Sequence, residues 1–520
     1  MLQATVESLL NYALLSLGIE KAQYKVDIPP KLELGDYATN AAILAARQLK
    51  KNPFELAQII SDKVKELDKE KLFSKIEIAK PGFINFFFNE SFIQQSTAEI
   101  IAKDHAWGQG TRGKGQGSRI LLEFVSANPT GPLHVGHGRW AVVGDCIARI
   151  LKAAGYKVES EFYVNNIGNQ VEKLWASVEA ARAGQPTPEN GYGGAYIKEV
   201  KGDNKEAVLQ FILGEQKETL GKLGVRFDRF FNESELHEKG EVKEAVSRLE
   251  QRHKTIVEGG AIWFKSMEMG DDKNRVLVRE DGNPTYLAAD LAYHLDKFSR
   301  GYDRLINIWG TDHHGYVKRL KAAVEAMGLP AENLEIIIGQ LVTLYRGNEP
   351  VRMSKRTGEM VTLQEVIEEI GADATRFFFA ASDVNSHLDF DLELAKKQSS
   401  ENPVYYVQYA HARICSIIKK AEGQGARGKG QEDLSGLTEP AERELMLKLL
   451  SFPDVVESAA RLRHPHRITE YGKEVATVFH HFYEKCRVLG NPARLALVDA
   501  SRITLRNVLE LLGINAPEAM

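Results

Sequence analysis

A strand–helix–strand pattern that occurs twice in the middle of the chain most constrains its fold. In the first copy, an apolar strand at residues 120–125 and a second strand at 156–164 flank a helix whose apolar residues share one face. In the second copy, strands at 304–309 and 334–344 flank a helix at 315–327. Because strands that alternate with helices favour a parallel sheet, we expect a Rossmann-like α/β domain.

The segments around this domain have different patterns. Residues 1–107 indicate a compact α+β unit, and a glycine-rich linker follows at 108–118. The α/β domain then spans 119–387 and includes a mostly helical, polar insertion at about 172–260. From 388 to 520 no strand pattern is evident, and amphipathic helices run to the end. The sequence therefore predicts a multidomain α/β protein with an N-terminal α+β domain and a C-terminal all-α bundle.

The composition restricts the class of protein. Apolar residues make up 43% of the chain and charged residues 27%, as in an ordinary globular protein. The net charge of −4 argues against a general DNA-binding protein, which usually carries a strong basic excess. Cys146, Cys415 and Cys486 form no CxxC pair, so neither a zinc ribbon nor a disulfide framework is indicated. The N-terminus lacks a signal-peptide pattern, and no apolar run approaches the roughly 20 residues that span a bilayer. We expect a cytoplasmic protein that binds neither DNA nor a membrane.

A segment rich in histidine and glycine joins the first strand to the first helix. The sequence PLHVGHG at 132–138 contains His134, Gly136 and His137. The N–H groups and positive dipole at a helix N-terminus suit a phosphate group, and glycines let ATP approach the backbone closely. Two imidazoles could also donate hydrogen bonds as charge develops at the α-phosphate. Taken alone, an ordinary helix cap with solvated histidines remains an open alternative.

A basic loop, RMSKRTG at 352–358, follows the second half of the sheet. Lys355 could meet the β- and γ-phosphates and stabilise departing pyrophosphate. A basic loop alone is more often a solvated turn. Together, however, the two segments resemble the two motifs of class I aminoacyl-tRNA synthetases. The second departs from the usual KMSKS at Arg352 and Arg356, which leaves the roles of both arginines open.

Longer matches indicate one family within this class. The stretch EFVSANPTGPLHVGH at 123–137 closely resembles the form of the first motif in arginyl-tRNA synthetases. Further matches occur in the order of that family along nearly the whole chain: residues 35–40, 81–86, 163–170, 281–294, 402–413 and 513–520. The resemblance implies that the α/β domain is catalytic, that the first domain contacts the tRNA elbow and that the C-terminal bundle binds the anticodon.

The resemblance also implies an arginine site. Asp290 matches a carboxylate that grips the substrate guanidinium, which a carboxylate can bind through two parallel hydrogen bonds. Tyr286 would line the same pocket, and Glu123, Asn128 and His134 match positions that hold the α-amino and carboxylate ends. Without the family, Asp290 would be interpreted as an acid on a helix surface.

The implied catalytic residues are His134, His137 and Lys355. We assign ATP to groups at both motifs and at the end of the strand at 304–309, where open α/β sheets bind ligands: Gly136, His137, Gly310, Asp312, His313, Met353, Ser354 and Lys355. Mg²⁺ should accompany ATP, because hard phosphate oxygens favour a hard cation. His313 and His314 have no third ligand at metal spacing, so we expect no zinc and no metal ligands in the protein.

Five residues match tRNA contacts of the family. Tyr406 and Arg413 lie seven residues apart on one helical face and match anticodon-loop contacts, and Met520 matches a terminal contact. Stacking on a tyrosine beside a cation suits unpaired bases. In the first domain, Asn85 matches a base-reading position and Phe83 stands where an aromatic is usual. Packing within its own domain remains the alternative for Tyr406 and for Phe83.

The predicted reaction joins L-arginine to tRNA(Arg) through an arginyl-adenylate and releases pyrophosphate and AMP. We expect a monomer whose partners are tRNA(Arg), L-arginine and ATP, and a first step that needs bound tRNA. Three alternatives stay open at this point. They are a glutamyl or class I lysyl synthetase, a small-molecule nucleotidyltransferase, which would lack the C-terminal bundle, and an inactive tRNA-binding paralogue.

Overall fold

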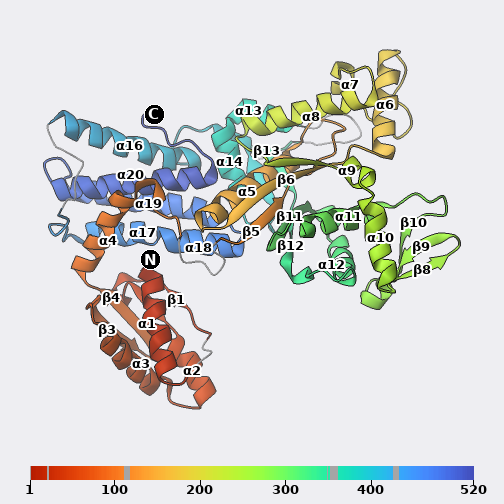
Figure 1. The fold of residues 1–520 in the computed structure, drawn as a ribbon. Helices are drawn as coiled ribbons and strands as arrows, with labels where there is room; N and C mark the ends of the chain where they lie inside the picture. Colours follow the sequence, from red (N-terminus) through yellow and green to blue (C-terminus); the bar gives the residue numbers. More distant parts are fainter. Residues whose placement is uncertain (1, 20–22, 111–116, 348, 352–360, 425–432) are drawn as a thin grey trace.

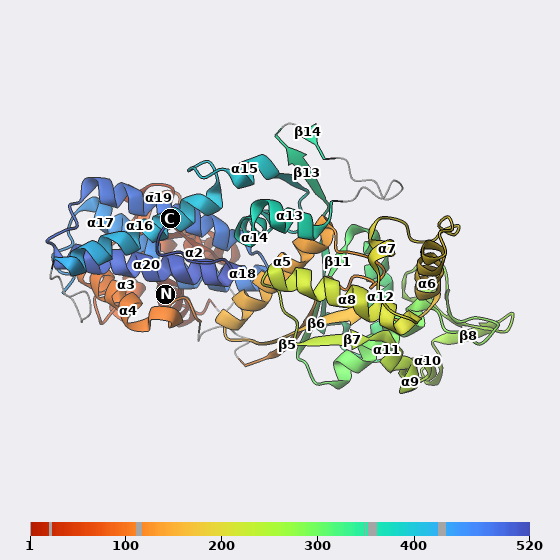
Figure 2. The ribbon, with the colours of Figure 1, turned by 90° about the horizontal axis from the view of Figure 1, so that it is seen from above.

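The computed structural model describes residues 2–19, 23–110, 117–347, 349–351, 361–424 and 433–520. Three parts are visible in Figure 1: an N-terminal α/β unit, a central α/β domain and a C-terminal helical bundle. Seen from above in Figure 2, the bundle and the central domain lie side by side along the long direction of the molecule. None of the helices in the described segments combines the length and apolarity that a membrane crossing would require.

The N-terminal unit is built on a four-stranded antiparallel sheet with strand order β1-β2-β4-β3. Alternation along β4 directs Ile84, Phe86 and Phe88 into the core, where each is at most 1% exposed. The elements are α1 (Leu2–Ser16), β1 (Val26–Asp27), β2 (Tyr37–Thr39), α2 (Ala41–Leu49), α3 (Pro53–Leu67), β3 (Phe73–Ala79), β4 (Phe83–Phe88) and α4 (Glu90–Lys103).

The central domain contains the predicted parallel sheet. Its five strands have the order β12-β11-β5-β6-β7, and all four pairings are parallel. Successive strands therefore run outward from β5 in both directions, which places the topological switch point between β5 and β11. The elements are β5 (Arg119–Glu123), α5 (Val135–Ala153), β6 (Lys157–Val164), β7 (Arg229–Asn232), α11 (Tyr286–Ser299), β11 (Arg304–Gly310), α12 (Tyr316–Ala326) and β12 (Leu334–Gly339).

The single strand predicted at 334–344 is wrong, because the chain changes sheets within it. β12 ends at Gly339, and β13 (Val342–Arg346) pairs instead with β14 (Glu349–Pro350) and β15 (Leu388–Asp391). Gly339 lies so close to Trp140 of α5 that a Cβ atom there would be 2.0 Å from the indole ring. β15 also contradicts the expectation that no strand follows residue 388. This strand is too short to be recognised from the sequence pattern.

The insertion predicted at 172–260 is helical only in part. β7 lies within it but belongs to the central sheet, where Phe231 is fully buried, and β8 and β9 form a separate antiparallel sheet with β10. Four residues are too few to show a strand period against a helical background. The elements are α6 (Asn169–Arg182), α7 (Tyr196–Glu199), α8 (Lys205–Lys222), α9 (Glu233–Glu238), α10 (Glu241–Gln251), β8 (Thr255–Glu258), β9 (Ala261–Phe264) and β10 (Arg275–Val278).

The predicted C-terminal bundle is present and packs against the central domain, with α18 and α20 beside α5 (Figure 1). Arg376 of α14 joins the parts. It is 1% exposed and donates from Nε to the Leu512 carbonyl at 2.7 Å, from Nη1 to the Leu223 carbonyl at 3.0 Å and from Nη2 to Asp145. The elements are α13 (Leu363–Ile370), α14 (Ala372–Ala380), α15 (Leu392–Lys396), α16 (Pro403–Gly423), α17 (Pro440–Leu450), α18 (Phe452–Leu462), α19 (His466–Lys485) and α20 (Pro492–Leu512).

Replacing this guanidinium should destabilise the whole protein. Arg376→Met keeps most of the side-chain volume but leaves two buried carbonyls and the Asp145 carboxylate short of a donor. We expect a loss of about 3–5 kcal/mol in the free energy of unfolding, measured by urea denaturation. The control is Arg346→Ala, which breaks an ion pair with Glu369. The Arg346 side chain is 49% exposed, so this substitution should lower the free energy of unfolding by about 1 kcal/mol or less. Equal losses in the two variants would contradict the role given to Arg376.

Candidate active site

The candidate active site starts at the first turn of α5. His134 caps the helix, because its Nδ1 accepts hydrogen bonds from the N–H groups of Gly136 at 3.1 Å and His137 at 3.4 Å. In return, the His134 N–H donates to His137 Nδ1 at 3.3 Å, and the two rings stack with centroids 3.6 Å apart. Two N–H groups that we expected to face phosphate are therefore already bonded. Since each Nδ1 accepts, a neutral ring carries its proton on Nε2.

The chain that follows the basic loop lies against this helix start. Thr362 forms an antiparallel bridge with His134, and the Leu363 N–H donates to the Leu133 carbonyl at 2.8 Å. Residues 362 and 363 are thus fixed beside the histidine motif. The predicted residues of the loop itself lie outside the described part of the chain: Arg352, Met353, Ser354, Lys355 and Arg356.

The predicted ATP cluster follows the neighbouring strand. β11 pairs with β5 as far as Glu123, so Gly310 lies beyond the carboxyl end of β5 at the switch point of the sheet. His313 follows in a short 3₁₀ turn, with its ring 5.4 Å from that of Trp309. The described side chains do not include that of Asp312. The structure thus brings the strand end predicted for ATP beside the loop that leads to His134.

Asp290 lies on α11, over the same end of the sheet. The Tyr316 hydroxyl donates to its Oδ2 at 2.6 Å. Burial, with the negative charges of Glu233 and Glu123 nearby, raises the pKa of the Asp290 carboxyl to about 7. Tyr286, one turn earlier on the same helix face, is 57% exposed. The carboxyl is therefore close to half-ionised at neutral pH, and a bound cation would stabilise its charged form.

Glu233 is a second acid at this place that the sequence pattern does not reveal. It is the first residue of α9 and is 6% exposed, and burial raises its pKa. Tyr163, near the end of β6, forms a hydrogen bond with it, and His237 Nε2 lies 3.9 Å from its Oε1. Acids are common in the first turn of any helix, so only the burial of Glu233 distinguishes it.

Glu123 belongs to a buried polar network that connects three elements. Its carboxylate accepts from the Lys297 ammonium, which is fully buried, and from the Ser126 hydroxyl at 2.8 Å. Lys297 also donates to the Asn307 amide oxygen at 3.0 Å, and the Asn307 amide nitrogen lies 3.0 Å from His294 Nε2. The charge predicted to hold the substrate is thus balanced within the protein, and Lys297 is a site residue that sequence spacing alone does not identify.

Helices of the insertion hold the loop that contains Asn128. Gln216 of α8 is 2% exposed and donates to the carbonyls of Asn128 at 3.0 Å and Gly131 at 2.8 Å. The Tyr196 hydroxyl of α7 donates to the Thr130 carbonyl at 2.7 Å. Side chains of the insertion therefore fix the path of the backbone between β5 and α5. The sequence pattern indicated only that this insertion is helical and polar.

Family models cover almost the whole chain. The one described as "Arginyl tRNA synthetase N terminal domain" matches residues 2–88, and "DALR anticodon binding domain" matches 407–520. Between them, "tRNA synthetases class I (R), catalytic domain" matches 98–193 and 195–414. The chain belongs to the arginyl-tRNA synthetase family. The Rossmann-like class I fold, with flanking N-terminal and anticodon-binding domains, is thereby confirmed.

Individual relatives agree with this assignment. An arginine–tRNA ligase of Heliobacterium modesticaldum is 44% identical over 533 residues, which cover 96% of this chain and 94% of that protein. One from Bacillus cereus is 45% identical and covers 94% of this chain and 92% of that protein. The solved Thermus thermophilus arginyl-tRNA synthetase has a TM-score of 0.82 at 25% identity and covers 100% of both chains.

The residues matched to the anticodon contacts of the synthetase family lie on one helix. Tyr406 of α16 is half-buried, with its hydroxyl 3.3 Å from Thr477 Oγ1. Arg413 is exposed, and its guanidinium lies 4.9 Å from the centre of the Tyr483 ring. Met520 is 56% exposed. Tyr406 packs within the bundle and is also partly accessible, so the two interpretations of this residue do not exclude each other.

A cavity in the N-terminal domain contains the other two tRNA candidates. It has a volume of about 450 Å³, and both Phe83 and Asn85 line it together with Lys25 and Lys80. Phe83 is 40% exposed, so the alternative that it is a core residue is wrong, whereas Asn85 is 5% exposed. An apolar face, a buried amide and two cations suit an unstacked base and its phosphate.

Removing the Gln216 side chain should loosen the loop before α5. Gln216→Ala removes the donor to the part-buried Asn128 and Gly131 carbonyls, which costs about 1–3 kcal/mol and should raise amide hydrogen exchange across residues 124–134 about tenfold or more. Mass-spectrometric exchange on the full chain measures this change. Gln58→Ala is the control, because the Gln58 amide bonds Asp62 on an exposed helix surface. Unchanged exchange at 124–134 in Gln216→Ala would exclude the positioning role.

Proposed function

We propose that the chain attaches L-arginine to tRNA(Arg) in two ATP-dependent steps. Relatives at 44% identity over nearly its full length are named arginine–tRNA ligase, and class I synthetases use ATP. The structural observation that carries the proposal is the enclosed pair of acids, Asp290 and Glu233, over the carboxyl end of the sheet. Such a site favours a cationic side chain over the glutamate substrate of a glutamyl synthetase.

The first step activates arginine. Its carboxylate oxygen attacks the α-phosphorus of ATP, and the bond to the β-phosphate oxygen breaks, which yields arginyl-adenylate and pyrophosphate. The Nε2–H groups of His134 and His137 donate to phosphate oxygens, Gly136 and Gly310 leave room for the nucleotide, and Lys355 stabilises pyrophosphate. In the second step a hydroxyl of the terminal tRNA ribose attacks the arginyl carbonyl, and AMP leaves.

ATP binds with Mg²⁺ in this proposal, since phosphate oxygens need a hard cation, and the chemistry requires no zinc. His313 and Asp312 follow the strand end that faces the nucleotide. Met353 and Ser354 complete the ATP site from the basic loop, whose following residue Thr362 bridges His134.

Arginine is recognised at both ends. Asp290 binds the guanidinium through two parallel hydrogen bonds, and Glu233 adds a second negative charge beside it. Tyr286 covers the pocket from the same helix face as Asp290. Asn128 and Glu123 hold the α-amino and carboxylate ends; although Glu123 accepts from Lys297 and Ser126, a carboxylate has further lone pairs for a ligand.

The tRNA contacts extend across the whole molecule. The proposed bounds are an elbow-binding domain at 1–107, a linker at 108–118, the catalytic domain at 119–387 and an anticodon domain at 388–520. Phe83 and Asn85 receive a base in the N-terminal cavity, while Tyr406, Arg413 and Met520 face the anticodon loop. The synthetase acts as a monomer in the cytoplasm, where it meets tRNA.

An aminoacylation assay with a panel of amino acids and total tRNA tests this function directly. Only arginine should be attached, and His137→Ala should lower kcat at least tenfold because it removes a hydrogen-bond donor to the phosphate. His105→Ala, whose imidazole is 63% exposed, is the matched control and should leave the rate unchanged. Charging with glutamate or lysine, or full activity of His137→Ala, would refute the proposal.

Arginine binding should depend on pH through Asp290. Only the ionised carboxyl pairs with the guanidinium, and its pKa in the free protein is about 7. The affinity should therefore fall as pH drops from 8 to 6 and level off above 8, and binding at pH 7 should release a proton as the pKa is drawn down. Calorimetry in two buffers of different ionisation heat measures both quantities.

Asp290→Asn is the control for this prediction, because an amide cannot ionise. It should bind arginine at least tenfold more weakly, and its residual binding should no longer vary with pH through this position. An affinity in the unsubstituted protein that stays constant between pH 6 and pH 8 would contradict the assignment of Asp290 to the guanidinium.

A further inference from the structure

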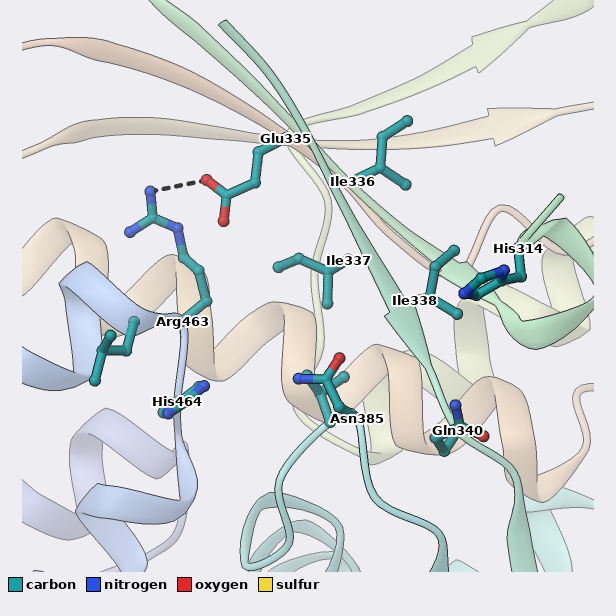
Figure 3. Close-up of a pocket in the computed structure, with 11 residues that line it drawn as sticks. His314, Glu335, Ile336, Ile337, Ile338, Gln340, Asn385, Arg463 and His464 are labelled. Atoms are coloured by element: carbon teal, nitrogen blue, oxygen red, sulfur yellow. Dashed lines mark hydrogen bonds and ion pairs between the residues drawn. The ribbon is translucent and has the colours of Figure 1, made fainter. Parts of the chain in front are cut away.

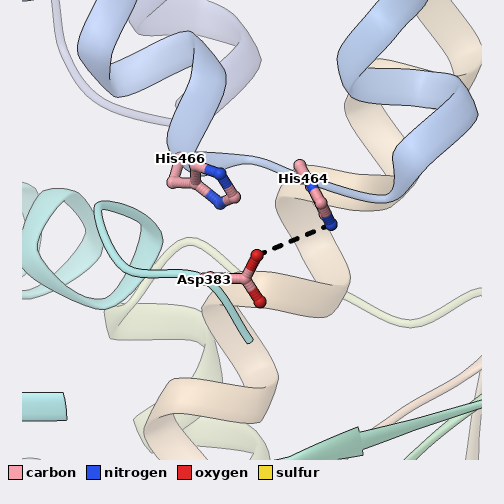
Figure 4. A group of neighbouring side chains, drawn as sticks. All are labelled: Asp383, His464 and His466. Atoms are coloured by element: carbon pink, nitrogen blue, oxygen red, sulfur yellow. Dashed lines mark ion pairs between the residues drawn. The ribbon is translucent and has the colours of Figure 1, made fainter. Parts of the chain in front are cut away.

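Three side chains that could ligate a metal meet where the bundle contacts the catalytic domain. Asp383 lies in the loop between α14 and β15, His464 lies in the turn between α18 and α19, and His466 is the first residue of α19 (Figure 4). One ligand atom of each lies within 4.8 Å of the others. In the described residues, this is the group of histidine, cysteine and acidic side chains that has such spacing.

The carboxyl of Asp383 is held in a fixed orientation without a metal. Its Oδ1 accepts from the Asn385 N–H at 2.8 Å and from the Asn385 side-chain amide at 3.0 Å. Its Oδ2 lies 3.6 Å from His464 Nε2. The Asp383 carbonyl in turn accepts from Arg139 at 2.8 Å. One carboxylate oxygen is thus directed at the imidazoles while the other secures the turn.

His466 has an unmet bonding requirement at this place. Its Nδ1 is buried and has no hydrogen-bond partner among the described residues. A buried polar atom without a partner costs free energy, and a ring nitrogen can satisfy that cost by donating a lone pair to a cation. The His464 and His466 rings lie with centroids 4.8 Å apart, so both nitrogens can reach one ion.

We propose that Asp383, His464 and His466 bind one Zn²⁺ ion. Two imidazoles and a carboxylate are a ligand set that zinc favours over the oxygen-seeking Mg²⁺. With bonds of about 2 Å, tetrahedral ligands lie roughly 3.3 Å apart, so side-chain rotation must shorten the distances between these ligand atoms by at most about 1.5 Å. The residues are half-buried, which leaves room for that rotation.

The fourth position of the ion faces an adjoining cavity. This cavity has a volume of about 430 Å³, and His464 lines it together with Val384 and Asn385, the residues that follow Asp383 (Figure 3). It gives an ion a route from solvent and leaves room for a water ligand. The bound ion would join the α18–α19 turn to the Asp383 loop, and through Arg139 to α5, which begins at the catalytic histidine motif.

This inference departs from the sequence expectation of no zinc. His464 and His466 are separated by one residue, but the third ligand lies in a different domain. The site therefore has no recognisable spacing motif in the sequence, and its three residues come together only in the fold. The role is structural and independent of the proposed reaction.

Zinc titration of the full chain, stripped of metals with a chelator, tests the site by calorimetry and thermal denaturation. We expect one Zn²⁺ per chain with a Kd of about 1 µM or tighter and a higher Tm with zinc. The double variant His464→Ala/His466→Ala should bind at least 100-fold more weakly. Asp383→Asn, which keeps an acceptor for the Asn385 turn, should lose at least tenfold.

His387→Ala is the matched control. His387 Nε2 lies 3.3 Å from Asp389 in an exposed pair that has no place in the three-residue group, so this variant should bind zinc as the unsubstituted chain does. Should the double variant fail to fold, Asp383→Asn and the visible absorption of bound Co²⁺ in the unsubstituted chain decide the question. Absence of one-to-one binding at 100 µM Zn²⁺, or equal affinity in Asp383→Asn, would overturn the proposal.

Discussion

The buried ion pair between Lys297 and Glu123 is the interaction on which the geometry of the active site depends. It fastens α11, which carries Asp290, to β5, which leads into the histidine motif, and Asn307 connects both to β11. Removing one partner of such a pair leaves an uncompensated charge in the interior and typically costs about 3–5 kcal/mol. The Lys297 ammonium thus bonds to two adjacent strands, β5 and β11. These contacts fix the position of α11, which carries Asp290, relative to the loop that leads to the histidine motif.

The same ion pair accounts for the distribution of charge in the pocket. Lys297 balances Glu123 inside the protein, and Asp290 and Glu233 are the acids that our proposal places around the guanidinium. Burial holds the pKa of the Asp290 carboxyl near 7. In the free site this carboxyl is therefore partly protonated, and a bound cation would shift it to the ionised form. In the proposed arrangement, desolvated carboxylates would bind a charged guanidinium more tightly than a neutral ligand of the same shape.

The sequence was sufficient for the repeated strand–helix–strand pattern, the family and the helical bundle, because those features are periodic over many residues. It was insufficient where the deciding information is tertiary. The strand break at Gly339 follows from contact with Trp140, β7 is too short to show a period, and Glu233 resembles any acid at a helix start. The sequence indicated the histidine motif at a helix start, but the mutual capping of the two rings was visible only in the fold.

The contact of Arg376 with the Leu512 carbonyl has a consequence for synthesis on the ribosome. Leu512 ends α20 and lies 136 residues after Arg376, so its carbonyl is made well after the guanidinium that donates to it. Until then the interior guanidinium has lost water without gaining its full set of acceptors. The packing of α5 against α14 is therefore complete only after α20 has been made, and proteins shortened before Leu512 would retain a defect in the middle of the molecule.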